Sequence, residues 1–439
     1  MEIKAYLDEF CKISCPCGKE HIMTIKDIVV KAGAIKELLN LISKFGAKKP
    51  FILADVNTFS VAGKAVLEIL DGENIPYSQY VFPDKRLEPD EKAVGSAVMH
   101  FDPTCDLVIA VGSGVINDIG KILANTTKSP YFIVGTAPSM DGYASSTSSM
   151  AMDGLKVSLP SKCADVIIGD IDILKNAPLK MLQSGLGDML AKYISIAEWK
   201  IAREILGEYY CDRVANLIKD ALKECVDNAE GLLSRDEKAV EAVFNGLVIG
   251  GIAMAFAGVS RPASGVEHYF SHIIDMRALE FGYKFDLHGI QCAVATLLCA
   301  RLYEKLLTIT PDKNKALSHA KAFDYDKHKK IMKEFLGKSA NAMFEIERKE
   351  KKYCKRKHKK RLDIILDKWE RIKEIIKNEI PTAKEIEQIL DKIGAPKTVK
   401  DLGIELDSYT AFTLTKDIRD KYVLSRLLWD LGEMGIFYD

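Results

Sequence analysis

The sequence has no uninterrupted run of about twenty apolar residues, so we expect no transmembrane helix. Its first residues are mixed and charged, without the apolar core of a signal peptide. The formal net charge is zero, with 62 basic and 62 acidic residues. This balance gives the chain as a whole no electrostatic attraction to nucleic acid or to an anionic membrane. We therefore expect a cytoplasmic protein without membrane or nucleic-acid partners.

Cysteine and histidine are scarce, with ten and eight in 439 residues. Ten cysteines are too few for a disulfide scaffold, and a reducing compartment would keep them as thiols. Cys15, Cys17 and His21 are spaced like part of a metal knuckle, but no second cysteine pair lies nearby, so we expect a structural or surface loop. The remaining composition, 48% hydrophobic and 28% charged, is typical of a globular chain of two or three domains.

The chain changes character near residue 182. Before it, short apolar runs alternate with amphipathic stretches, and the runs expected to form strands are 25–33, 50–56, 77–82, 106–112 and 131–136. Such alternation indicates a parallel α/β sheet. After it, long stretches have helical periodicity and almost none resembles a strand. The sequence thus predicts an α/β domain over 1–182 and an all-α domain over 183–439.

A glycine-containing loop joins an expected strand to an expected helix in DLVIAVGSGVINDIGKILA, residues 106–124. Gly112 and Gly114 lack Cβ, so the backbone can approach a phosphate, and the start of the following helix favours an anion. The full G-x-G-x-x-G pattern is absent, because Asp118 stands near the third glycine position. An ordinary turn is the alternative, but the carboxyl end of a parallel strand favours nucleotide binding.

Two further polar features follow expected strands. Asp55 could accept the ribose hydroxyls of an adenosine and disfavour a 2′-phosphate, which mildly favours NADH over NADPH, or it could cap the next helix. The stretch 135–150, GTAPSMDGYASSTSSM, is rich in small residues around Asp141. It could lie against a ligand, or it could be a plain loop.

Four residues of the second half could bind a metal. His268 and His272 are four apart and share a helix face, and Asp188 and His288 add a carboxylate and a third imidazole. A catalytic metal typically needs three protein ligands and one open position. The spacing alone suggests the histidine pair as joint ligands, although the H-E-x-x-H motif is absent because Tyr269 follows His268.

The segment RKEKKYCKRKHKKR, residues 348–361, is strongly basic. It could bind an anion or RNA. Acidic residues flank it and no aromatic platform interleaves it, so we favour a solvated helix face.

Several motifs together resemble the sn-glycerol-1-phosphate dehydrogenase family, in the wider group of iron-type alcohol dehydrogenases, glycerol dehydrogenases and dehydroquinate synthases. They occur in the order GSGVIND, TAPSMDGYAS, SGLGDMLAKY, SRPASGVEHYFSH and LHG. The segment CPCGK-x-H resembles the bacterial branch. The resemblance spans most of residues 25–300 and is weaker beyond about 310.

The resemblance implies an active site between an α/β nucleotide domain and a helical, metal-binding domain. It implies Asp188, His268 and His288 as metal ligands, so His272 becomes a neighbour near substrate, able to relay a proton. Lys192 stands where the alcohol dehydrogenases often have a histidine ligand, and its cation suits a phosphorylated substrate. Arg261 is a second phosphate candidate. Asp141 would lie towards the nicotinamide and substrate.

The same resemblance implies a cofactor site and a reaction. The cofactor-binding residues would be Asp55, Gly112, Ser113, Gly114, Asn117, Asp118, Thr136, Ser139 and Ser145. The cofactors would be NAD(H), with NADP(H) as the alternative, and one divalent metal, Zn²⁺ ahead of Ni²⁺ or Fe²⁺. The expected reaction is reversible reduction of dihydroxyacetone phosphate to sn-glycerol 1-phosphate by a homo-oligomer, a dimer or larger. Glycerol dehydrogenase is the alternative, and nucleic-acid binding through 348–361 is a weaker one.

Overall fold

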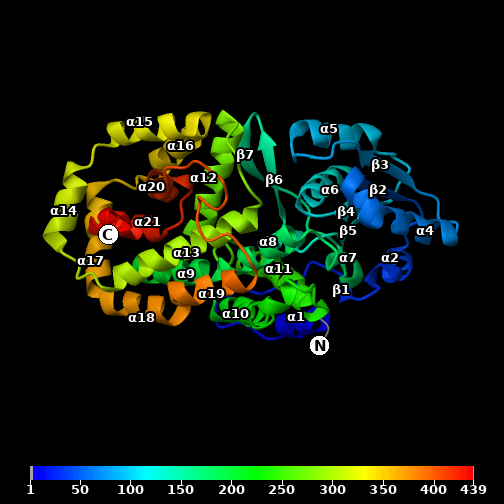
Figure 1. The fold of residues 1–439 in the computed structure, drawn as a ribbon, viewed down its shortest axis with the longest axis horizontal. Coiled ribbons are helices and arrows are strands. Elements are labelled where there is room, and N and C mark those ends of the chain that lie inside the picture. The colour runs from blue at the N-terminus through cyan, green and yellow to red at the C-terminus, as the bar shows by residue number, and fades with distance from the viewer. Residues whose placement is uncertain (1–2, 439) are drawn as a thin grey trace. The chain divides into compact units, whose positions relative to one another are not determined.

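A computed structural model describes residues 3–438 (Figure 1). The chain divides into two compact units. Unit 1 comprises the described residues of Met1–Asp153 together with Val157–Met189 and Asn216–Val259. Unit 2 comprises Gly154–Lys156, Leu190–Ala215 and the described residues of Ser260–Asp439.

The units do not divide the chain at residue 182. The predicted boundary marks a change from strands to helices, whereas the compact units are interleaved, because the chain passes between them after Met189, Ala215 and Val259. Two consecutive domains therefore describe the secondary structure of the chain better than its packing.

Unit 1 contains a six-stranded sheet in which all neighbouring strands are parallel, as predicted. Its order is β1-β8-β5-β4-β2-β3. The strands are β1 (Asp27–Lys31), β2 (Pro50–Asp55), β3 (Ser78–Phe82), β4 (Leu107–Gly112), β5 (Tyr131–Gly135) and β8 (Val166–Asp170). Sequence analysis did not identify β8 or the two-stranded hairpin β6 (Thr147–Met152) and β7 (Leu155–Pro160).

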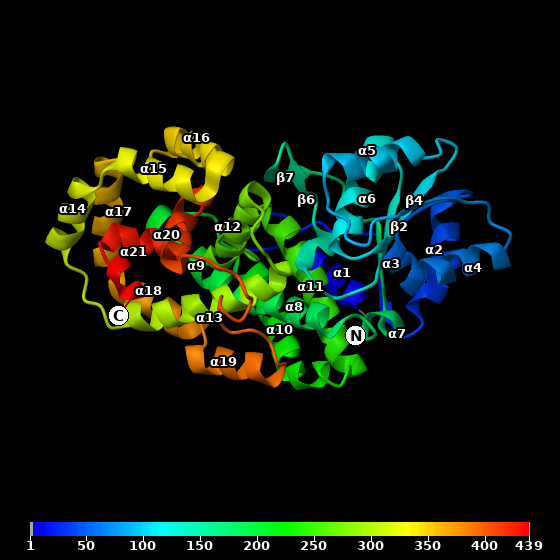
Figure 2. The ribbon, with the colours of Figure 1, turned by 45° about the horizontal axis from the view of Figure 1, so that its top comes forward.

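Helices cover both faces of this sheet (Figure 2). On one face, the apolar sides of α2 (Leu38–Phe45) and α4 (Lys64–Gly72) form a buried core with alternate residues of the strands. On the other face lie α5 (Glu91–His100) and α6 (Gly114–Thr127), where Gly120 lets α6 approach Tyr131 and Ala110. A sheet buried on both faces explains why its strands are continuous apolar runs.

Helix α11 (Glu237–Ala257) completes unit 1 from a distant part of the chain. The ring of Phe244 lies against the backbone of β5 and β8, where a Cβ on Gly135 or Gly169 would come within 3.0 Å and 2.4 Å of it. Two glycines at one level of the sheet therefore make room for a single aromatic side chain.

Helix α11 bears on the expectation that the chain has no transmembrane helix. An 18-residue window of it has a mean hydropathy of 1.8, so one described helix is long and apolar enough to cross a membrane. However, 78% of that window is buried inside the protein. Its apolar length is that of a core helix, buried on most sides.

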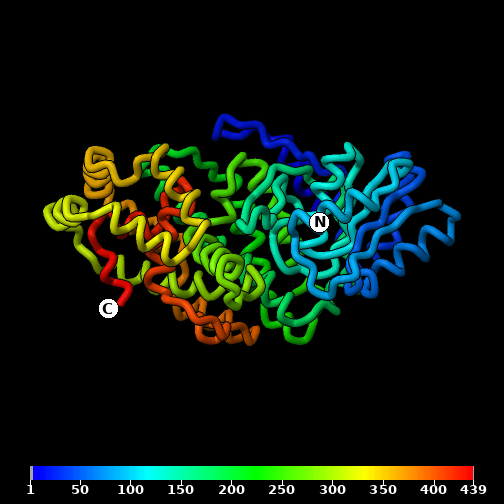
Figure 3. The backbone as a smooth tube through the Cα atoms, turned by 90° about the horizontal axis from the view of Figure 1, so that it is seen from above, coloured from blue at the N-terminus to red at the C-terminus, as the bar shows by residue number. Residues whose placement is uncertain are grey.

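Apart from the first two residues of β7, the regular structure of unit 2 is helical, and no strand follows β8 in the described residues, as predicted. The helices that matter below are α9 (Lys192–Leu206), α12 (Val266–Phe281), α13 (His288–Leu307), α20 (Ser408–Ile418) and α21 (Leu424–Leu431). Figure 3 shows segments far apart in sequence side by side, the yellow α14 (Lys313–Ala322), the orange α17 (Lys355–Asp367) and the red α21.

Candidate functional site

The glycine loop of unit 1 has the geometry of a close backbone turn. Gly112 ends β4 and Gly114 begins α6. A Cβ on Gly112 would lie 2.4 Å from that of Ile116, so no larger residue fits. A Cβ on Gly114 would lie 3.3 Å from Met140 Cε. The turn therefore presents backbone N–H groups at the start of α6, which suits an anion.

The loops after β4 and β5 lie side by side because those strands are paired neighbours. The Thr136 N–H donates to the Gly112 carbonyl at 3.1 Å, and the Ser113 and Ser139 hydroxyls are 2.7 Å apart. Thus Ser113, Thr136 and Ser139, predicted to bind cofactor, meet at one edge of the sheet. Ser145 lies farther along, where its hydroxyl is 3.0 Å from that of Thr147 at the start of the hairpin.

Asn117 and Asp118 hold neighbouring loops in place. Buried Asn117 donates to the Gly142 carbonyl at 3.0 Å and accepts from the Tyr131 hydroxyl at 2.9 Å. Asp118 pairs with buried Lys121 at 2.8 Å and accepts the Ser149 N–H at 3.2 Å. Both residues therefore position the loop after β5 and the hairpin behind the glycine turn.

Asp55 forms the helix cap that sequence analysis left open. Its Oδ1 accepts the N–H groups of Asn57 and Thr58 at 2.7 and 3.0 Å, and the Thr58 hydroxyl completes a capping box at the start of α3 (Val56–Thr58). The carboxylate sits at the carboxyl end of β2, next to β4. Capping by Oδ1 is compatible with a ribose contact through the other oxygen.

Asp141 and Asp188 are also linked within unit 1. The Asp141 N–H, at the start of η3 (Asp141–Ala144), donates to Asp188 Oδ2 at 2.9 Å. Asp188 is fully buried on α8 (Leu179–Leu190), and the same helix donates from Ser184 to the Ser139 carbonyl at 2.8 Å. The small-residue stretch 135–150 therefore orients the carboxylate proposed as a ligand.

Three histidines form a cluster on α12 and α13 in unit 2. The ring centroids of His268 and His288 are 5.0 Å apart, and those of His272 and His288 are 5.6 Å apart. His288 is the first residue of α13, and the turn that joins the two helices places it against α12. The sequence prediction that these histidines gather is thus matched by the geometry, although their roles as ligands remain predictions.

Two of the rings are oriented by hydrogen bonds through Nδ1. The His268 Nδ1 lies 2.8 Å from Glu267 Oε1, and the His288 Nδ1 lies 2.9 Å from the Ser271 hydroxyl. Gln291 donates to the same hydroxyl at 2.9 Å. Partners at Nδ1 leave Nε2 as the coordinating atom, which is the usual arrangement around a metal-binding histidine.

The cluster has a member that sequence analysis missed. Cys292 lies one helical turn beyond His288 on α13, with its Sγ 3.6 Å from Nε2 of that ring. Donor atoms of His268, His288 and Cys292 all lie within 4.8 Å of one another, close enough for one ion. The four-residue spacing between His288 and Cys292 could have identified this residue from the sequence, because it places both side chains on one helix face.

The electrostatics of the cluster favour a neutral ring at His272. Burial, followed by the neighbouring rings of His288 and His268, holds the pKa of His272 well below its usual value. Its Nδ1 is buried without a hydrogen-bond partner among the described residues. Burial raises the pKa of the Cys292 thiol, but the two adjacent imidazoles lower it more, so the net shift is downward. A neutral His272 ring and a thiol of lowered pKa are both suited to binding a cation.

Gly265 separates two buried carboxyl groups next to the cluster. A Cβ at this glycine would lie 2.6 Å from Glu198 Oε2 and 2.7 Å from Glu267 Oε2. Burial and then the charge of Glu267 raise the pKa of Glu198 to about 8. Glu198 is therefore largely protonated at neutral pH, and Glu267 is the charged member that faces the His268 ring.

Two lysines of unit 2, the buried Lys192 and the half-buried Lys421, contact one short segment. Lys192, the predicted phosphate ligand, donates to the Ala263 carbonyl at 3.0 Å. Lys421, which sequence analysis missed, donates to the Ser264 carbonyl at 2.7 Å. Burial, followed by the charge of Arg261, lowers the pKa of Lys421 to about 7. The two ammonium groups therefore converge on neighbouring carbonyls.

Arg261 has a structural partner. Its guanidinium binds both oxygens of Glu208, at 2.8 and 2.6 Å, and donates to the Tyr422 carbonyl at 2.8 Å. A bidentate pair of this kind uses most of the guanidinium donors. It leaves Arg261 poorly placed for the phosphate role considered from sequence.

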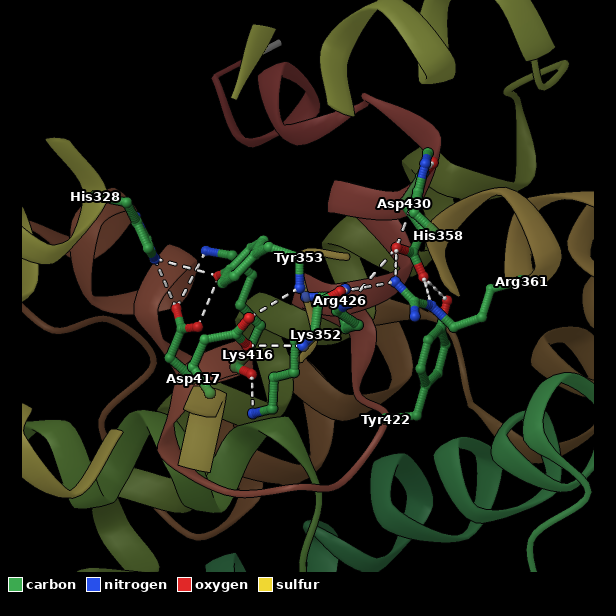
Figure 4. A network of polar contacts seen from close by, with 11 residues as sticks. His328, Lys352, Tyr353, His358, Arg361, Lys416, Asp417, Tyr422, Arg426 and Asp430 are labelled. Carbon is green, nitrogen blue, oxygen red and sulfur yellow. Dashed lines mark hydrogen bonds and ion pairs between the residues drawn. The ribbon is translucent and has the colours of Figure 1, made fainter. Parts of the chain in front are cut away.

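The basic segment 348–361 is not a uniformly solvated face. Figure 4 shows several of its side chains directed towards two buried carboxylates, Asp417 and Asp430. The Tyr353 hydroxyl donates to Asp417 at 2.6 Å, and Arg361 forms a bidentate pair with Asp430 at 2.8 and 2.9 Å. This part of the segment belongs to the interior of unit 2, while its other lysines remain exposed.

Comparison with known proteins agrees with the fold. Residues 29–178 match the family model of iron-containing alcohol dehydrogenase. A glycerol-1-phosphate dehydrogenase [NAD(P)+] of Bacillus velezensis is 32% identical over 305 residues, 67% of this chain and 77% of its own. A protein of the same name from Halalkalibacterium halodurans is 28% identical over 394 residues, 89% and 88% of the two chains. Among solved structures, glycerol dehydrogenase from Schizosaccharomyces pombe has a TM-score of 0.62 at 15% identity, covering 96% and 91%.

Proposed function

Because this chain belongs to the glycerol-1-phosphate dehydrogenase family, we propose that it reversibly reduces dihydroxyacetone phosphate to sn-glycerol 1-phosphate, consuming one NAD(P)H and one proton. Family membership identifies the reaction class, an NAD(P)-linked oxidoreductase. The observation that carries the site is the oriented histidine cluster, in which His268 and His288 are each held through Nδ1.

We propose Asp188, His268 and His288 as the ligands of one divalent metal. Each is already oriented within its own unit, by the Asp141 N–H, Glu267 and Ser271 respectively. When bound, the metal polarises the substrate carbonyl oxygen and the nicotinamide supplies the hydride. Imidazole and carboxylate donors accept Zn²⁺, Ni²⁺ or Fe²⁺, and we place Zn²⁺ first.

His272 is proposed to move the proton that the reaction requires. Its ring is neutral and stacks at 18° against that of His288, and its buried Nδ1 has no hydrogen-bond partner among the described residues. A neutral imidazole beside the reacting oxygen can pass a proton to or from water. In this proposal Asp141 acts mainly through its backbone, as a positioning residue for Asp188.

Lys192 and Lys421 are proposed to bind the substrate phosphate. Lys192 is buried and Lys421 is half-buried, and both side chains now donate to carbonyls of the segment 263–264, a contact that phosphate oxygens can replace with charge-assisted bonds. This pair distinguishes a phosphorylated ketone from dihydroxyacetone. Arg261 is left out, because Glu208 engages it.

The nucleotide is proposed to bind at the carboxyl edge of the sheet. Gly112, Ser113 and Gly114 would contact the pyrophosphate, with Thr136 and Ser139 beside it and Asp55 towards the ribose. Asn117 and Asp118 would support these loops, and Ser145 would lie at the margin. The choice between NADH and NADPH stays a prediction, as do the cytoplasmic location and the homo-oligomeric state.

The direct test is NADH oxidation by chelated and then metal-reloaded protein, with dihydroxyacetone phosphate beside dihydroxyacetone. We expect metal-dependent turnover of the phosphorylated ketone, and a rise in its KM in Lys192→Met and Lys421→Met without a matching change for the unphosphorylated ketone. Turnover of dihydroxyacetone alone would instead indicate a glycerol dehydrogenase and remove the phosphate role of both lysines. Turnover of neither ketone would contradict the proposed reaction.

A further inference from the structure

A second group of metal-ligating side chains lies in unit 1, in the segment between α1 (Ile3–Lys12) and β1. One donor atom from each of Cys15, Cys17 and His21 lies within 4.8 Å of the others. The Cys17 Sγ to His21 Nε2 distance is 3.6 Å. Two ligands of a tetrahedral zinc, at about 2.3 Å for sulfur and about 2.0 Å for nitrogen, are themselves about 3.5 Å apart. The spacing already matches that of bound ligands.

The His21 ring is held in the tautomer that coordination needs. Its Nδ1 lies 3.2 Å from the Phe256 carbonyl oxygen, which can only accept, so Nδ1 carries the hydrogen. The lone pair is then on Nε2, the atom that faces Cys17. A backbone carbonyl at the far nitrogen is a common partner of metal-binding histidines.

The surroundings hold the ring still. His21 is 5% exposed and its centroid lies 5.8 Å from that of Phe10 and 5.5 Å from that of Phe256. The loop itself turns at Gly18, which has φ +80° and donates to the Cys15 carbonyl at 3.1 Å. A second anchor is Lys19, which donates to the Ala257 carbonyl at 2.7 Å. The two cysteines therefore sit on a fixed turn beside a fixed imidazole.

We propose that Cys15, Cys17 and His21 bind a structural zinc ion, separate from the metal of the histidine cluster. Two thiolates and an imidazole favour Zn²⁺ over hard cations such as Mg²⁺ or Ca²⁺. Residues 13–26 contain no helix or strand. The ion would thus fasten this irregular segment to the end of α11, where Phe256 and Ala257 already hold it.

A structural zinc usually has four protein ligands, so one further donor is required. The number of sulfur neighbours measured by zinc X-ray absorption identifies its type. If the count is three, serine variants of the remaining cysteines locate it.

The experiment uses the full chain without an affinity tag, in a His268→Ala/His288→Ala background that removes the other site. Zinc content and the thiolate-to-cobalt absorption band of the Co²⁺-loaded protein are measured. We expect about one tightly held ion per chain with a thiolate band. Adding Cys17→Ser should abolish both, whereas Cys105→Ser, a buried cysteine outside the group, should change neither.

Two variants at position 21 distinguish the loss of a metal ligand from the loss of the fold. His21→Cys keeps a zinc ligand and should retain the ion, while His21→Phe fills the same aromatic niche without a donor and should lose it. Absence of bound zinc in the double-alanine background, or equal zinc in His21→Phe and its parent, would overturn the proposal. Neither result depends on turnover, so neither bears on the proposed reaction.

Discussion

Two buried clusters of unit 2 handle charge in opposite ways. Around Asp417 and Asp430, each carboxylate is bonded to basic or hydroxyl groups (Figure 4). Burial alone would raise the pKa of Asp417, but Lys416 and His328 lower it far below its usual value. This network consists of paired charges.

The histidine cluster, in contrast, contains three imidazole rings and a carboxylate bonded to one of them. Three imidazoles share the space, and the carboxylate of Glu267 is bonded to only one of them. Burial keeps His272 neutral, and its Nδ1 has no partner among the described residues. The comparison teaches that a network of paired charges contributes to stability, whereas a cluster of buried imidazoles with few charges is arranged to receive a cation.

Removing one ring should have the largest effect. We expect His268→Ala to lower kcat/KM by at least about 1,000-fold, because about 4 kcal/mol of transition-state stabilisation would be lost with the metal. The thermal midpoint should barely change. His100→Ala, an exposed histidine of unit 1, is the control for steady-state kinetics. A large fall in the midpoint of His268→Ala would assign the cluster to stability instead.

The reverse is expected of the ion network. Asp417→Asn leaves Lys416 and Lys352 without their buried counter-charge, so the free energy of unfolding should fall by about 3–5 kcal/mol in urea titrations. Activity per folded molecule should remain. Asp227→Asn, which breaks the exposed pair with Lys223, should have no measurable effect. Similar results for the two variants would mean that solvent screens the Asp417 network.

A smaller effect is expected for the group behind the ligand. Glu267→Gln keeps the shape of the side chain but removes the charge that faces His268 Nδ1, so the metal Kd should rise about 10–100-fold in chelator competition. Ser271→Ala, which removes the partner of His288, should act in the same direction. Unchanged affinity in both variants would show that the rings are oriented by packing alone.

The last prediction concerns pH. Glu198 has its pKa raised to about 8 in the folded protein, from 4.5. Between these values the folded state binds more protons than the unfolded state, so this group makes stability fall as pH rises towards 8. Glu198→Gln should flatten that decline in unfolding titrations across this window. If the variant's free energy of unfolding depends on pH as steeply as that of the parent protein, a group other than Glu198 takes up the proton.

Much of this could be predicted from sequence, and the exceptions have physical reasons. The five predicted strands formed because their apolar runs are buried on both faces of the sheet. In β8 only three apolar residues precede Gly169 and Asp170, and β6 is built of serine, threonine, methionine and alanine, which give little strand signal. The histidines stood out by their spacing on one helix face, whereas Glu198 and Lys421 reach α12 only through tertiary packing.

The basic segment shows the same limit. Its composition alone suggested either a nucleic-acid patch or a solvated face, and both hypotheses treat its charges as exposed. Their partners, Asp417 and Asp430, lie on α20 and α21, more than fifty residues later in the chain. Local charge patterning cannot anticipate a counter-charge at such a separation.

The interleaving of the two units bears on how the protein is made. Phe244, which fits against Gly135 and Gly169, is translated well after the last strand of the sheet. Ribosomes add about 5–20 residues per second, so the end of that sheet waits for several seconds without its aromatic cover. The emerging chain must hold an unfinished unit 1 while it begins unit 2. Chaperone capture at this stage, or a pause placed after Val259, would act on a defined folding intermediate rather than on a finished domain.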